Sequence, residues 1–131
     1  MAKGIEIRDA HYPGRPPIDA YGAGGFRFAD MSHRGSILCL PSGVHGWDVT
    51  GPEGISEANL SAVLDEAGDI EVLLVGMGTE FRRMPKELQA LLRERGVVTD
   101  AMSTGSAVRT YNVLLSEDRA VAAALIAVEN P

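Results

Sequence analysis

The run VLLV at residues 72–75 constrains this chain more than any other stretch, because it leads directly into the tetrapeptide GMGT at 76–79. A continuous apolar run that ends in glycines is typical of a strand buried on both faces. The sequence next predicts a helix over 85–95, with a proline in its first turn and a glycine after its last, and a second strand over 97–101. Residues 70–101 therefore predict one βαβ crossover, with parallel strands and a right-handed connection.

Two further elements follow this unit, and one precedes it. Apolar residues at 60, 63, 64 and 67, between Ser56 and Gly68, predict an amphipathic helix over 57–67. A helix over 104–115 should follow the second strand. The alanine-rich segment 119–128 suits either a helix or a final strand, and we favour the strand because the sheet otherwise lacks a member.

The N-terminal third is richer in turns. Phe26 and Phe28 alternate with an arginine, and this pattern predicts a β-hairpin between 25–28 and 36–40 with a connection of five or six residues. A third strand is expected over 44–49, with Trp47 as its inward anchor. Residues 1–20 are expected to be loosely ordered, with a short strand over 4–7 and a loop over 12–17.

Length and charge narrow the class of protein. A chain of 131 residues fits a single domain, 1–131, that buries about two-thirds of its unfolded surface. A formal net charge of −6 argues against nucleic-acid binding. No apolar run reaches the ~20 residues of a membrane span, and the N-terminus lacks the apolar core of a secretory signal. Cys39 is the only cysteine, which fits a reducing compartment, so we expect a cytoplasmic protein.

The carboxyl ends of the two parallel strands form the candidate site, because α/β sheets place ligands where such strands end. Helix N-termini offer free N–H groups and arginines offer guanidinium groups, so a crevice between 76–79 and 102–109 suits a small carboxylate or phosphate. In the alternative interpretation the glycines serve a tight turn, the hydroxyls only cap a helix and the arginines are surface residues. The candidate residues for a ligand or a partner are Gly76, Gly78, Thr79, Arg82, Arg83, Met102, Ser103, Thr104, Arg109, Thr110, Tyr111 and Asn112.

No catalytic, metal or cofactor site is predicted. The dinucleotide fingerprint is incomplete, since Phe81 stands where its third glycine belongs. Ser106 is not in a G-x-S-x-G turn, and no histidine is close to it in sequence. The three histidines are not at metal-ligand spacing. Cys39 alternates with leucines in a strand and is expected to be a buried, inert thiol.

Several segments resemble the signature of a small domain of unknown function found widely in bacteria and archaea. They are GMGTEFRRMP, GVVTDAMSTGSAVRTYNVLLSEDRAVAAALI, AYGAGGFRF and GSILCLP, together with Trp47, and they cover about residues 20–128. Relatives in that family include a mitochondrial assembly factor for respiratory complex I and an animal protein linked to adipocyte differentiation. The resemblance implies a three-layer α/β fold around a small mixed sheet with an antiparallel member. It implies no established activity, cofactor or catalytic residue.

Two function hypotheses result. The first is a non-enzymatic protein that binds a protein partner, as an assembly or stability factor does. The second is a binder of a small anionic ligand, or an enzyme, that uses the crevice between 76–79 and 102–109 and requires a concave, positively charged pocket there. Nucleotide or hydride chemistry is a third hypothesis, which requires a bound cofactor.

Overall fold

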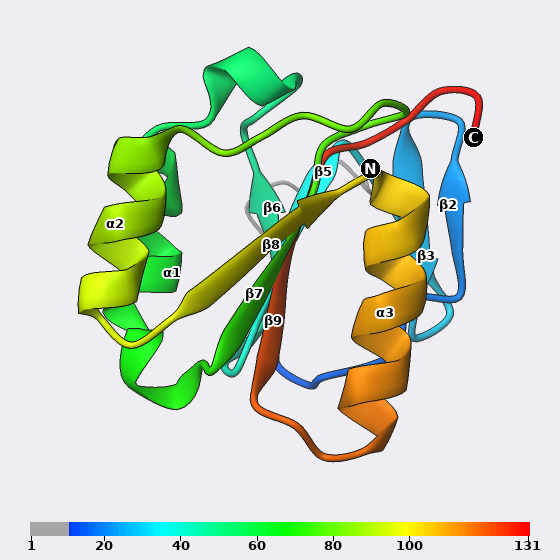
Figure 1. Ribbon diagram of the computed structural model, residues 1–131. Helices are drawn as coiled ribbons and strands as arrows, with labels where there is room; N and C mark the ends of the chain where they lie inside the picture. The colour runs from blue at the N-terminus through cyan, green and yellow to red at the C-terminus, as the bar shows by residue number, and fades with distance from the viewer. Residues whose placement is uncertain (1–10) are drawn as a thin grey trace.

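The computed structural model describes residues 11–131, which form an α/β fold with two sheets (Figure 1). The larger sheet contains β1 (His11–Tyr12), β5 (Ser36–Leu40), β6 (Gly43–Trp47), β7 (Val72–Gly76), β8 (Val98–Met102) and β9 (Val121–Leu125). The smaller sheet contains β2 (Ala20–Gly22), β3 (Gly25–Phe28) and β4 (Met31–Arg34). The helices are α1 (Ser61–Asp65), α2 (Lys86–Glu94) and α3 (Thr104–Ser116). The strand expected over 4–7 lies outside the described residues.

The larger sheet is mixed, as expected. Its order is β1-β6-β5-β9-β7-β8. β7 runs parallel to both β8 and β9, whereas β9 runs antiparallel to β5. The parallel pairing of β7 and β8 around α2 confirms the predicted βαβ unit. The final segment is a strand rather than a helix, and its five residues are all buried at the centre of the sheet.

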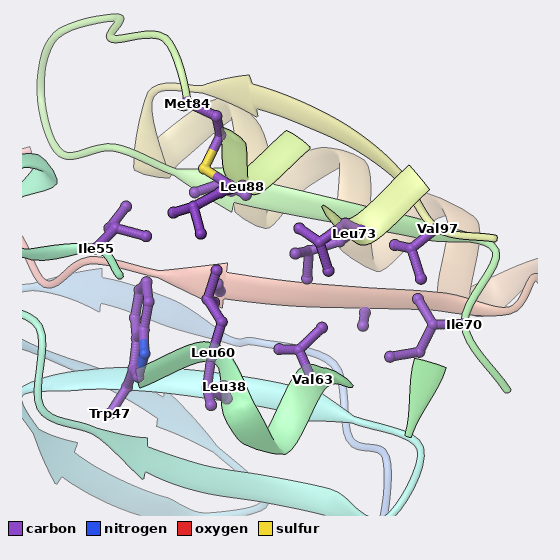
Figure 2. Close-up of a cluster of buried hydrophobic side chains, with 14 of the residues drawn as sticks. Leu38, Trp47, Ile55, Leu60, Val63, Ile70, Leu73, Met84, Leu88 and Val97 are labelled. Carbon is purple, nitrogen blue, oxygen red and sulfur yellow. The ribbon is translucent and has the colours of Figure 1, made fainter. Parts of the chain in front are cut away.

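The helices cover the two faces of this sheet, α1 and α2 on one and α3 on the other (Figure 1). Alternation along β5 shows why both faces are apolar, since Leu38 and Leu40 pack toward α1 and α2 while Ile37 and Cys39 pack toward α3. Figure 2 shows the cluster on the α1 and α2 face, where Trp47 lies among leucines and valines from α1, α2 and the strands. The predicted inward anchor is therefore confirmed.

The predicted hairpin was wrong in its pairing. β3 pairs with β4, which lies inside the segment interpreted as a connection, and β5 pairs instead with β6 and β9. Ala29 and Asp30 join β3 to β4 with φ values of 50° and 61°. Two left-handed residues form the kind of tight turn whose twist suits a hairpin. Alanine is not a typical turn residue, so the sequence pattern does not indicate that the chain turns at residues 29 and 30 and forms β4 before β5.

The helix predicted over 57–67 was wrong in its length. The segment consists of 3₁₀ turns at Ala58–Leu60 and Ala67–Asp69 around the five residues of α1, and Gly68 lies inside the second turn rather than after a helix. Asn59 is tied to its surroundings, because its carbonyl accepts the Trp47 indole N–H at 2.7 Å and its side-chain amide donates to the Gly54 carbonyl at 2.7 Å. The periodicity identified the buried face correctly but overestimated the regularity of the backbone.

Candidate functional site

Thr104 joins three segments at the carboxyl end of the sheet. Its hydroxyl accepts the N–H of Gly78 at 3.0 Å and donates to the carbonyl of Ile126 at 2.7 Å. Its own backbone N–H donates to the Gly78 carbonyl at 2.8 Å. The side chain has no exposed surface. This threonine therefore fastens the start of α3 to the turn after β7 and to the chain after β9.

Gly76 is a glycine because the start of α3 approaches it closely. A Cβ on this residue would lie 2.9 Å from the Cα of Thr104 and 3.1 Å from Cδ2 of Leu125. The first contact is with backbone, which cannot move aside without shifting the helix. The predicted crevice between β7 and α3 is thus occupied at this point by direct backbone packing.

The N-terminus of α3 is capped by Ser103. The Ser103 hydroxyl accepts the N–H of Ser106 at 3.3 Å, while Arg109 donates to the Ser106 hydroxyl at 3.4 Å. Gly105 lies beneath the Tyr21 hydroxyl of β2, which a Cβ at this position would strike. The first turn of α3 is therefore in contact with the smaller sheet.

Tyr111 and Asn112 hold other parts of the chain against α3. Tyr111 is 1% exposed and is hydrogen-bonded to the Cys39 thiol. Burial raises the pKa of Cys39 to about 12 and also raises the pKa of Tyr111. The Asn112 side chain accepts the N–H of Ile18 and donates to its carbonyl, each at 2.9 Å. Cys39 is buried, as expected, and both α3 residues have clear packing roles.

An open hollow of about 400 Å³ lies beside this closed junction. The residues that line it are Thr50, Pro52, Met77, Gly78, Thr79, Glu80, Arg82, Ile126, Ala127, Val128, Glu129 and Asn130. Three predicted site residues, Gly78, Thr79 and Arg82, are among them. The lining carries one arginine against two glutamates, so its formal charge is −1.

The remaining predicted residues lie elsewhere. Met102 is half-buried and packs with the cluster under α3, and Thr110 is half-buried on α3. Arg83 is exposed on the connection between β7 and α2, two residues after Phe81, whose side chain is 61% exposed. The structure thus brings together Gly78, Thr79 and Arg82 but does not place Arg109 in the same hollow.

Residues 18–126 match the family model described as "Protein of unknown function (DUF498/DUF598)". The chain belongs to this family. A relative from Rhodobacter capsulatus, described as uncharacterized, is 44% identical over 119 residues, which span 91% of this chain and 90% of that protein. The resemblance found in the sequence motifs is therefore confirmed.

Two further relatives extend the comparison. NADH dehydrogenase [ubiquinone] 1 alpha subcomplex assembly factor 3 of Mus musculus is 30% identical over 122 residues, and the match covers 93% of this chain but 66% of that protein. A crystal structure titled as an outer membrane protein from Bartonella henselae is 64% identical, with a TM-score of 0.88, over 91% of this chain and all of that one. The fold of this DUF498/DUF598 protein is therefore shared with a solved structure.

Residues 11–131 contain neither a cluster of metal-binding side chains nor a helix able to span a membrane. No group of three or more His, Cys, Asp or Glu side chains in that range is placed to hold a metal ion. No helix in the same part of the chain has the length and apolar character needed to cross a membrane. His33 is 4% exposed, and burial lowers its pKa although a hydrogen bond with the Ser36 backbone acts in the opposite direction.

The sequence motifs of this DUF498/DUF598 protein did not identify one wall of the hollow. That wall is the C-terminal tail, which is held by bonds from the N–H groups of Ala23 and Gly24 to the carbonyls of Glu129 and Val128, at 2.8 and 2.9 Å. These partners lie at opposite ends of the described chain. No local pattern in the tail signals such a contact, so sequence reasoning had no means of finding it.

Proposed function

We propose that this protein acts by binding a protein partner, as an assembly-type factor. The observation that carries the proposal is the likeness over 122 residues to a protein named as an assembly factor for NADH dehydrogenase. The shared region spans 93% of this chain, so the likeness extends over nearly the whole length of the chain rather than one segment. We further propose that the protein forms one domain and works in the cytoplasm.

The surface supports this proposal through its exposed apolar side chains. Phe81, Val98 and Val113 are 61%, 61% and 55% exposed, and they lie on the β7–α2 connection, β8 and α3. Phe81 is followed directly by two exposed arginines. Aromatic residues and arginine are enriched where protein partners meet.

Site-specific photo-crosslinking in cells tests the proposal. A photoreactive amino acid replaces Phe81, Val98 or Val113 in turn, and replaces the exposed polar residue Glu94 as the matched control. A light-dependent adduct of discrete mass from at least one apolar position, absent from the control, is the expected result. If all three positions give only the background of the control, the protein-partner proposal fails. Fractionation of the same cells tests the cytoplasmic location.

A second candidate is the binding of a small anionic ligand in the hollow, although its formal charge of −1 does not match the positive charge expected there. Its volume of about 400 Å³ suits a small molecule, and Gly78, Thr79 and Arg82 offer backbone groups, a hydroxyl and a guanidinium to a carboxylate or phosphate. Glu80 and Glu129 oppose an anion electrostatically.

Thermal unfolding against phosphate, short carboxylates and nucleotides tests the ligand candidate. A ligand at 100 times its dissociation constant adds about 2.7 kcal/mol to stability. The expected rise in midpoint disappears in Arg82→Ala and persists in Arg109→Ala, because Arg109 does not line the hollow. This candidate fails if none of the compounds raises the unfolding midpoint, or if the rise disappears equally in both variants.

A further inference from the structure

β8 forms one edge of the larger sheet. It has five residues, and all five are paired in regular parallel register with β7. On its other side β8 has no neighbouring strand in residues 11–131. In Figure 1 β8 crosses the front of the molecule, with α2 on its left and α3 on its right.

Two backbone hydrogen bonds establish which backbone groups of β8 point outward. The Val98 N–H donates to the Glu71 carbonyl at 3.0 Å, and the Met102 carbonyl accepts the Met77 N–H at 2.8 Å. Even-numbered residues therefore direct their backbone groups toward β7. Because the direction alternates along a strand, Thr99 and Ala101 direct their N–H and C=O groups away from the sheet.

This edge lacks most devices that prevent pairing with another chain. Natural edge strands are protected by short length, lysine, proline or bulges, and β8 has none of these. Val98 presents a β-branched apolar side chain with 61% exposure. Asp100, also exposed, is the one charged residue of the strand.

We propose that β8 is a docking edge for an extended segment of a partner protein, which adds a seventh strand to the sheet through Thr99 and Ala101. The side chains of Val98, Asp100 and Met102 lie on one face of β8, so the segment facing them would carry apolar, basic and apolar residues at alternate positions. This pattern is the same in both directions, so it fits a parallel or an antiparallel partner. The inference rests on the proposed partner-binding function and names its surface.

A second copy of this chain fits the edge poorly. Antiparallel pairing of two β8 strands over their full length is centred on Asp100, which places the two carboxylates directly opposite each other. Like charges in that position destabilise a strand pair. Each chain also carries a formal net charge of −6, which adds to the repulsion.

Fluorescence anisotropy with synthetic peptides tests the docking edge. One peptide carries the core Val-Thr-Lys-Thr-Val, and its matched control has Glu in place of Lys. At low salt the wild-type protein should bind the lysine peptide about two- to five-fold more tightly than the glutamate peptide, and Asp100→Lys should reverse that preference. Thr99→Pro removes one outward donor and should abolish binding, whereas Thr99→Val retains the N–H and should bind like wild type.

Amide hydrogen exchange of the wild-type protein supplies a second readout that does not depend on any variant. The lysine peptide should slow exchange at the N–H groups of Thr99 and Ala101. The proposal is overturned if those two amides are unaffected, if the two peptides bind equally, or if Thr99→Pro folds and binds normally. Self-association that Thr99→Pro abolishes, without peptide binding, would also overturn it in favour of a second copy.

The crosslinking experiment separates this inference from the function on which it rests. Adducts at Phe81 or Val113 with no peptide binding at β8 would leave the partner-binding proposal intact and remove the docking edge. If all three apolar positions give no more crosslinked adduct than the control, the partner-binding proposal itself fails.

Discussion

The two glycines of the GMGT turn lie two residues apart in regions of opposite character. Gly76 belongs to a closed junction, where a Cβ would come within 2.9 Å of the Thr104 backbone. Gly78 faces the open hollow, where a Cβ would meet nothing within 4 Å, and it is a glycine because its φ is 102°. The same residue type therefore serves packing at one position and backbone conformation at the other. A motif alone does not distinguish a packed junction from an accessible site.

The largest loss of stability is expected from a substitution at Tyr111, which is buried under α3. Tyr111→Ala should lower the free energy of unfolding by roughly 3–5 kcal/mol, because it removes a ring that is 1% exposed under α3. Tyr111→Phe retains the ring and loses the hydrogen bonds that its hydroxyl makes with Cys39 and Arg15, for about 2 kcal/mol. Urea denaturation measures both. Near-native stability of Tyr111→Ala would place this residue in a functional rather than a packing role.

Gly76→Ala tests the close approach of β7 and α3. The added methyl group requires the Thr104 backbone to shift, and we expect a loss of about 3 kcal/mol. Gly68→Ala is the matched control, because its Cβ would meet nothing within 4 Å and the residue is exposed; its effect should stay within about 0.5 kcal/mol. Equal effects of the two substitutions in thermal unfolding would contradict a closed junction.

Thr104→Val examines the hydrogen bonds that fasten the junction. Valine keeps the shape but leaves the Gly78 N–H and the Ile126 carbonyl without the hydroxyl, so we expect a loss of about 2 kcal/mol. Thr104→Ser retains the hydroxyl and removes one methyl group, which should cost about 1 kcal/mol. If chemical denaturation ranks serine below valine, packing rather than hydrogen bonding dominates here.

Exposed residues at the rim of the hollow should tolerate substitution with little change in stability. Arg82→Ala is expected to change the free energy of unfolding by no more than about 0.5 kcal/mol, because the residue is exposed at the rim of the hollow. Arg83→Ala, on the same connection but outside the hollow, is the control. Circular dichroism on heating measures both, and a substantial loss in Arg82→Ala would show that this arginine supports the fold.

Much of the core architecture was predictable from local patterns. The apolar run of β7, the proline and glycine that flank α2, and the Ser103 cap of α3 each report on a few neighbouring residues. β9 was ambiguous, because its alanines suit either a helix or a strand. Its place between β5 and β7, buried on both faces, decides for the strand.

The candidate site was predictable only in part. The sequence pointed to the strand ends, but it did not show that Thr104 closes the space beside Gly76 or that residues 126–130 form a wall of the hollow. The pairing of β3 with β4 was missed for the same reason. All three features depend on contacts between segments, and the sequence around each segment does not indicate which other segment it contacts.

By itself, the sequence determined which segments are buried, where most of them begin and end, and to which family the chain belongs. Only the tertiary structure decided which strands pair, which glycine is enclosed, and that β8 lies at an edge of the sheet formed by residues 11–131. The physical reason is that hydrophobic period, caps and glycine conformation act over a few residues. Sheet order and close packing instead depend on which distant segments meet, and that depends on how the whole core is filled.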